Sequence, residues 1–175
     1  MMKVLILVKT YPAISTKYGE TVCTAGITED GNWVRIYPIP FRKINYKTRF
    51  KKYEWIEADL IENQSDFRPE SFRPVDYEKI HAIDEIKPDG NTWEERREYV
   101  LKNIYTNLET LIKDAKDKNK CTSLAVKQKY FEDFAKTKDY YFFLGTTKMH
   151  HYTAPNPFVI IGDFRPKPIV QEELF

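Results

Sequence analysis

The chain has 175 residues, of which 42% are hydrophobic and 31% charged, so it is long enough for one domain or two very small ones and too polar for a membrane-embedded protein. Its formal net charge is +2, yet residues 1–53 hold ten Lys or Arg against three Asp or Glu, whereas residues 54–110 hold seven against fifteen. This asymmetry predicts one anion-attracting face, unless the two regions interdigitate in the fold and cancel.

The N-terminal third predicts a β meander. An apolar run at residues 4–8 predicts a fully buried strand over 3–10, and the run is too short for a secretory signal. We therefore expect a cytoplasmic protein with no membrane contact. Strands at 20–28 and 33–39 should flank the turn at 29–32, because its Asp-Gly step is a strong hairpin signal.

Further strands and a helix follow in the middle of the chain. A basic connection at 41–52 leads to an alternating strand at 53–61, a loop at 63–74 and a short strand or edge at 80–86. Thr92 and Glu95 then form a capping box, which predicts the start of an amphipathic helix. That helix should span residues 93–116.

The C-terminal part predicts a second short helix at 123–136, then strands at 140–145 and 158–164 on either side of a polar loop at 146–157. Together the elements predict an α+β, mainly β fold: a small antiparallel β-barrel with one long helix packed on it. The last two strands either complete the barrel or form a reduced second one. The expected divisions are 1–88 for the barrel portion, 89–120 for the helix, 121–168 for the strand pair and 169–175 for a tail.

The third strand carries the first candidate site. Its alternation places Trp33, Arg35 and Tyr37 on one face, and rings beside a guanidinium are suited to stacking with the bases of a single strand. The alternative is a core face in which Arg35 forms an ion pair at the rim with Glu20 or Glu57.

The basic connection is the second candidate site. It interleaves positive charges, Arg42 and Lys43 among them, with aromatic rings, a mixture that follows a phosphate backbone. A solvated loop is the alternative.

In the polar loop before residue 20, Ser15 and Lys17 are spaced like a nucleophile and a base, but no oxyanion-hole signal accompanies them. We interpret that loop, with Tyr18, as lying beside a ligand.

The loop at 146–157 holds Lys148, His150 and His151. Adjacent histidines on an extended chain point opposite ways, so we expect no shared metal ion and no cofactor. The histidines either fix the loop by hydrogen bonds or contact a phosphate or nucleotide. If they converged with Lys148 and Glu20 in one cleft, the protein would be an enzyme acting on nucleotides or nucleic acid.

The final residues predict a docking peptide. Gln171, Leu174 and Phe175 resemble the Gln-x-x-Leu-Phe peptides by which bacterial replication and repair proteins bind the DNA sliding clamp. Gln offers hydrogen bonds and Leu-Phe fills an apolar pocket, whereas a tail packed on the core is the alternative.

Several segments carry a family resemblance. KTYP at 9–12, ETVCTAGIT at 20–28 and WVRIYPIP at 33–40, together with YFFLGTTK at 141–148, His150-His151 and APNPF at 154–158, resemble the dual OB-containing domain family of small prokaryotic proteins. That family is often found among mobile and defence-associated genes. The resemblance implies an OB-like barrel and binding of nucleic acid or a nucleotide.

The function that we predict is a nucleic-acid-binding accessory protein without catalytic residues, whose partner is single-stranded nucleic acid. The alternatives are the enzyme described above and a protein-interaction module of a defence or mobile-element system. The predicted nucleic-acid contacts are Lys9, Lys17, Tyr18, Trp33, Arg35, Tyr37, Arg42, Lys43, Lys148, His150 and His151.

Overall fold

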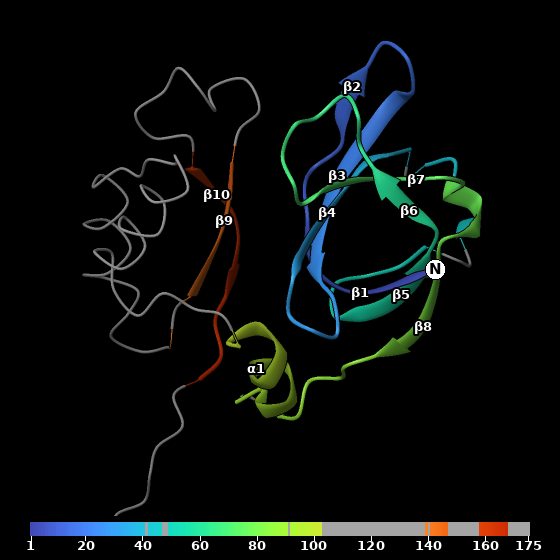
Figure 1. Ribbon diagram of the computed structural model, residues 1–175. Coiled ribbons are helices and arrows are strands. Elements are labelled where there is room, and N and C mark those ends of the chain that lie inside the picture. Colours follow the sequence, from blue (N-terminus) through green and yellow to red (C-terminus); the bar gives the residue numbers. More distant parts are fainter. Residues whose placement is uncertain are drawn as a thin grey trace, which may run out of the picture. The chain divides into compact units, whose positions relative to one another are not determined.

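The computed structural model describes residues 1–40, 42–46, 49–90, 92–102, 139, 141–146 and 158–167. The predicted α+β, mainly β class is confirmed, because strands dominate the described chain and are accompanied by the α-helix α1 (Glu94–Val100) (Figure 1). The chain divides into two compact units, one formed by Met1–Lys87 with Glu98–Lys102 and the other by Pro88–Arg97 with Asn103–Phe175.

The first unit is a curled sheet with the strand order β6-β7-β4-β3-β1-β5-β8. The short strand β2 also pairs with β3 but lies outside this order. Neighbouring strands are antiparallel except β4 and β7, whose parallel pairing departs from the predicted antiparallel arrangement. The strands are β1 (Met2–Lys9), β2 (Ala13–Ser15), β3 (Gly19–Ile27), β4 (Trp33–Ile39), β5 (Glu54–Ala58), β6 (Leu60–Glu62), β7 (Ser71–Pro74) and β8 (His81–Glu85).

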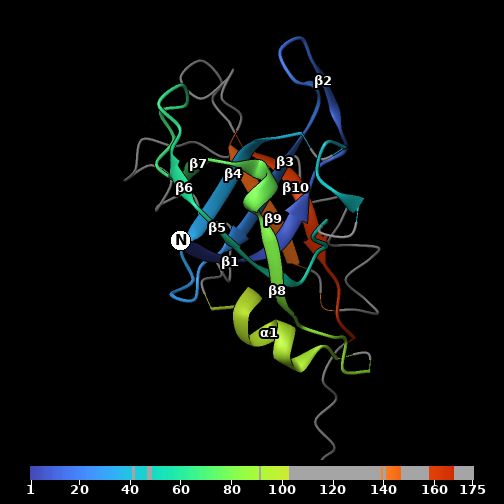
Figure 2. The ribbon, with the colours of Figure 1, turned by 90° about the vertical axis from the view of Figure 1, so that its right-hand side faces the viewer.

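Asp59 explains why this sheet is curled rather than open. It is the single residue between β5 and β6, yet these strands belong to opposite ends of the strand order. Two strands joined by one residue must lie close together, so the sheet bends until its ends approach one another (Figures 1 and 2). The Asp59 carbonyl also accepts a hydrogen bond of 2.9 Å from the Val75 N–H just after β7.

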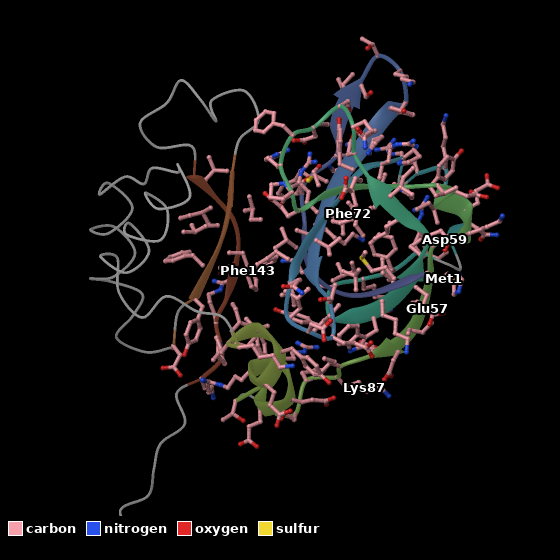
Figure 3. The ribbon with its side chains drawn as sticks, in the orientation of Figure 1. Met1, Glu57, Asp59, Phe72, Lys87 and Phe143 are labelled. Atoms are coloured by element: carbon pink, nitrogen blue, oxygen red, sulfur yellow. The ribbon has the colours of Figure 1, made fainter. Side chains whose placement is uncertain are left out.

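Apolar side chains fill the inside of the curl. Val4 and Ile6 of β1 point into it, while Leu5 and Leu7 on the opposite face are buried as well, so the prediction of a fully buried first strand is confirmed. Phe72 packs against the same core from β7 (Figure 3). The buried core residues are Val4, Ile6, Val34, Ile36, Ile39, Ile44, Phe50, Ile56, Ala58 and Ile80.

β1 and β3 approach so closely that only glycine fits at Gly26. A Cβ atom there would overlap the Leu5 carbonyl oxygen and the Val4 side chain. The missing side chain thus lets the two central strands of the sheet pair.

The observed strands agree with the predictions where a strand's own residues or an adjacent turn indicated it. β1, β3 and β4 lie within a residue of the predicted bounds, and the edge strand expected at 80–86 is β8. The strand expected at 53–61 is instead divided at Asp59 into β5 and β6. The loop expected at 63–74 contains β7, and the polar loop after β1 contains β2.

The second unit contains a two-stranded antiparallel sheet of its own, formed by β9 (Tyr141–Thr146) and β10 (Phe158–Phe164). Phe164 is buried, with its ring centroid 5.6 Å from Trp93 and 5.9 Å from Tyr141. Arg97 donates hydrogen bonds to Asp139 Oδ2 at 2.7 Å and to the Lys167 carbonyl at 2.9 Å. The first turn of α1, up to Arg97, therefore belongs with this small sheet.

At the start of α1, the Glu94 N–H donates to Asp89 Oδ2 at 2.9 Å, so a carboxylate satisfies this amide. The helix begins close to the predicted residue 93. It ends at Val100, and residues 101–102 form a turn, so the prediction of one continuous helix over 93–116 is wrong at this point. Residues 103–116, the helix expected at 123–136 and most of the loop at 146–157 lie outside the described residues.

Candidate nucleic-acid interface

The segment between β4 and β5 holds a set of cations at one end of the curled sheet. Ile44 and Phe50 of this segment are buried in the core and anchor it at two points. The charged side chains of Arg42, Lys43, Lys51 and Lys52, which flank these anchors, are exposed. This segment is the basic connection predicted from the sequence.

Arg49 fixes the shape of the connection from within. Its Nε donates to the Ile44 carbonyl at 3.2 Å, and its Nη2 donates to the Arg42 carbonyl at 3.0 Å. Its guanidinium carbon lies 5.6 Å from the centroid of the Tyr46 ring. Arg49 belongs to the basic and aromatic run that the sequence indicated, although it was not among the individually predicted contacts.

An ion pair joins the connection to the β2–β3 hairpin. Arg42 Nε lies 2.6 Å from Glu20 Oε2, while the Arg42 side chain stays 78% exposed. Glu20 belongs to β3 and pairs with Ile14 of β2. The connection and the root of the hairpin therefore lie at the same end of the sheet.

Lys9, at the end of β1, lies beneath the connection. Its Nζ donates to the Phe50 carbonyl at 2.8 Å and lies 5.0 Å from the centroid of the Phe50 ring. Burial lowers the pKa of Lys9 to about 8, with a further lowering by the charge of Arg49 and an opposing effect of Glu54. Lys9 is thus a half-buried cation that still carries its proton at neutral pH.

These residues form a surface that we name the basic patch. Two carboxylates lie among its cations, Glu20 and the buried Glu54, whose Oε2 accepts the Lys51 N–H at 2.7 Å. The patch carries excess positive charge, and most of its cationic side chains reach solvent. Its described cations are Lys9, Arg42, Lys43, Arg49, Lys51 and Lys52.

The predicted strand face on β4 is organised differently. The Arg35 side chain is only 18% exposed, and its Nη1 donates to Asp66 Oδ2 at 3.1 Å and to Ser71 Oγ at 2.8 Å. Its guanidinium lies 4.8 Å from the Tyr37 ring centroid. The alternative partners expected for Arg35, Glu20 and Glu57, are therefore wrong, because the loop before β7 brings Asp66 closer.

Asp66 is held by two arginines. Burial alone would raise the pKa of the Asp66 carboxyl, but hydrogen bonds from Arg68 and the charges of Arg68 and Arg35 lower it to about 2. Arg68 is itself buried and donates to both Asp66 oxygens. This cluster joins the loop between β6 and β7 to β4.

The other predicted contacts are spread along the sheet. Trp33 lies at the start of β4, next to the turn, with 37% of its surface exposed. In the hairpin loop, Lys17 Nζ lies 5.2 Å from the Tyr18 ring centroid, and the Tyr18 N–H donates to Ser15 Oγ at 3.3 Å. Ser15 thus shapes the turn of a hairpin that projects from the sheet (Figures 1 and 2).

One comparison identifies a family for this fold. The family described as "Domain of unknown function (DUF8758)" matches residues 1–102. The chain belongs to this family. The DUF8758 match covers all strands from β1 to β8 and helix α1, and its description gives no activity. No curated protein and no solved structure matches the chain.

Several predicted site residues lie outside the part of this DUF8758 protein that the structure describes. They are Lys148, His150, His151, Gln171, Leu174 and Phe175. Catalysis by the histidine loop and docking of the tail to a sliding clamp therefore stay predictions. Within the described ranges, the structure contains no group of three or more His, Cys, Asp or Glu side chains placed to hold a metal ion. No helix in those ranges is long and apolar enough to cross a membrane.

Proposed function

We propose that this protein binds nucleic acid and that the basic patch contacts the phosphate backbone. The observation that carries the proposal is the excess of cations around Lys9 and the segment between β4 and β5, held in place by Ile44, Phe50 and the hydrogen bonds of Arg49. A cluster of cations that follows a chain segment is suited to a polyanion, because successive phosphates can meet successive side chains.

The strand connectivity supports an OB-like barrel as part of the same proposal. β1 pairs with β3 and β5, β3 pairs with β4, and β7 closes the curl through a parallel pairing with β4 and an antiparallel pairing with β6. With β5 and β6 counted as one bent strand, and with β2 and β8 as additions to the sheet, these pairings favour a five-stranded Greek-key barrel of the OB type. Such barrels bind oligonucleotides on a strand face and the adjoining loops.

Within this proposal, Tyr37 and Lys17 extend the surface from the basic patch across the β3–β4 face and the hairpin. Arg35 has a supporting role, since its guanidinium is already engaged by Asp66 and Ser71. Arg35 orients the Tyr37 ring against which it lies. Replacing Arg35 would therefore disturb the barrel as well as any bound strand.

Fluorescence anisotropy with a labelled oligonucleotide tests the proposal. We expect binding at low salt whose affinity falls as salt rises, because bound phosphates release counterions. The double variant Lys43→Gln and Lys52→Gln should weaken binding and reduce the slope of log K against log salt by about 1.4, which corresponds to two lost contacts on a single strand.

The matched control is the double variant Lys3→Gln and Lys87→Gln, which has the same net charge. Lys87 lies at the end of the sheet away from the β2–β3 hairpin (Figure 3), and Lys3 is six residues from Lys9 along β1, about 20 Å. Absence of binding at low salt would refute the proposal. Equal losses in the two double variants would show attraction by net charge alone and would also refute it.

A further inference from the structure

We propose that Tyr46 and Arg49 form a stacking platform for an unpaired base, so that the basic patch prefers single-stranded nucleic acid to duplex. This inference rests on the proposed function and deepens it, because the cations of the patch would serve a duplex equally well. The two residues lie on the segment between β4 and β5 rather than on the β3–β4 face.

The exposure of Tyr46 is the first observation. Its side chain is 81% exposed although it lies two residues from the buried Ile44. A ring in this position adds little to the core, and most of its surface faces solvent. Aromatic rings of this kind stack on nucleic-acid bases, because every base has a π-face.

The position of Arg49 is the second observation. Its planar guanidinium lies 5.6 Å from the Tyr46 ring centroid and is held by hydrogen bonds to the carbonyls of Arg42 and Ile44. The neighbouring cation is therefore fixed in place beside the ring, and a base stacked on Tyr46 would also lie close to positive charge. The pair of Lys17 and Tyr18 in the hairpin has a similar distance of 5.2 Å, but the lysine is a point charge without a planar face.

The surroundings of the ring supply phosphate contacts. Arg42 and Lys43 precede Tyr46 on the same segment, and both side chains are exposed. A nucleotide whose base stacks on Tyr46 would thus have cations within reach of its phosphates. Bases in a duplex have both faces covered by their neighbours, so only an unpaired base can use the ring.

The experiment compares Tyr46→Leu and Tyr46→Phe in the full chain, with a labelled 15-nucleotide oligothymidine and a labelled duplex of equal length as probes. We expect Tyr46→Leu to weaken single-strand binding about tenfold, as the stacking of one base predicts. Tyr46→Phe should stay within about twofold of the parent protein, because the ring is kept. Duplex binding and the salt slope should not change in either variant.

Three outcomes would overturn the platform while leaving the proposed function intact: no effect of Tyr46→Leu, equal losses for the single strand and the duplex, or equal losses for Leu and Phe. In each case the parent protein would still bind with its salt dependence. If the parent protein binds neither probe at low salt, the proposed function and the platform both fail. Urea denaturation of each variant separates these results from a loss of folding.

Discussion

The ion pair between Arg35 and Asp66 gives both side chains a structural role before any ligand is considered. Asp66 has only 5% of its side chain exposed and accepts hydrogen bonds from two arginines. Removing one member of a buried ion pair leaves the other charge without compensation, which costs about 3 kcal/mol or more. The strand face on β4 therefore depends on a loop that lies about thirty residues further along the chain.

We predict that Asp66→Asn lowers the free energy of unfolding at pH 7 by about 3 kcal/mol. The pKa of Asp66 is about 2 in the folded protein against an ordinary value of 3.8. A lowered carboxyl pKa contributes stability that is complete above pH 3.8 and is lost as the pH falls through 2, so the difference between parent and variant should shrink in that range. Urea denaturation from pH 7 to pH 2 measures it.

Asp30→Asn is the control, because Asp30 lies exposed in the turn between β3 and β4. It should leave the unfolding midpoint nearly unchanged at every pH. A pH-independent difference between the parent protein and Asp66→Asn would contradict the role given to the ionised carboxyl.

Lys9 leads to a prediction about binding rather than stability. Its pKa of about 8 lies below the ordinary 10.5, so the half-buried side chain loses its charge at a lower pH than an ordinary lysine side chain. We expect oligonucleotide affinity to fall as the pH rises through 8 at constant ionic strength. In Lys9→Arg this fall should disappear, because arginine keeps its proton.

Unfolding does not explain such a fall. Between pH 8 and pH 10.5 the folded state binds fewer protons at Lys9 than the unfolded state, so this group makes the protein more stable as the pH rises. Anisotropy titrations from pH 6.5 to pH 9.5 provide the measurement. An identical decline in Lys9→Arg would assign the pH dependence to another group.

Among the elements, the pairing of β1 with β3 has the strictest steric requirement. Gly26 faces the Leu5 carbonyl with no room for a Cβ atom. We predict that Gly26→Ala destabilises the protein by about 3 kcal/mol or more, because the two central strands must separate to admit a methyl group. The change in the urea midpoint relative to the parent protein measures this effect.

Gly19→Ala is the comparison for that substitution. Gly19 has a φ of +79°, but a Cβ atom there would contact nothing within 4 Å. This substitution should lower the free energy of unfolding by about 1 kcal/mol, because only the left-handed backbone conformation disfavours alanine there. Equal effects at the two positions would mean that the close approach of β1 and β3 is not what requires Gly26.

Elements with local signals could be predicted from the sequence, and elements defined by distant partners could not. The apolar run of β1 and the Asp-Gly turn between β3 and β4 are local, and both were predicted correctly. β7 has four residues and pairs in parallel with a strand more than thirty residues earlier. Its own residues, Ser71–Pro74, lack the alternation that would have indicated a strand.

The candidate site likewise combines features that the sequence indicated with features that depend on the fold. The basic connection was visible in the sequence because its charges are consecutive, and the structure brings Lys9 to it through the Phe50 carbonyl. The partner of Arg35 was predicted wrongly, because the choice among several carboxylates is made by the course of the loop between β6 and β7. Exposure of the Tyr46 ring likewise depends on where the flanking residues are anchored.

For the whole molecule, the family match contains the complete first unit. The match ends at residue 102 and also includes Pro88–Arg97 of the second unit, whereas β9 and β10 lie beyond it. The basic patch, the β2–β3 hairpin and the Arg35 cluster all belong to the first unit. The proposed binding surface therefore lies entirely within the residues that the family model matches.

The bend at Asp59 has a consequence for the way the barrel opens. β5 and β6 continue into one another, yet β6 forms one edge of the sheet and β5 carries the other edge strand, β8. Separation of β6 from the sheet therefore also displaces β5, which carries β8, because Asp59 alone lies between β5 and β6. Backbone amides at both edges should exchange their hydrogens through one shared opening reaction, instead of through two independent local fluctuations.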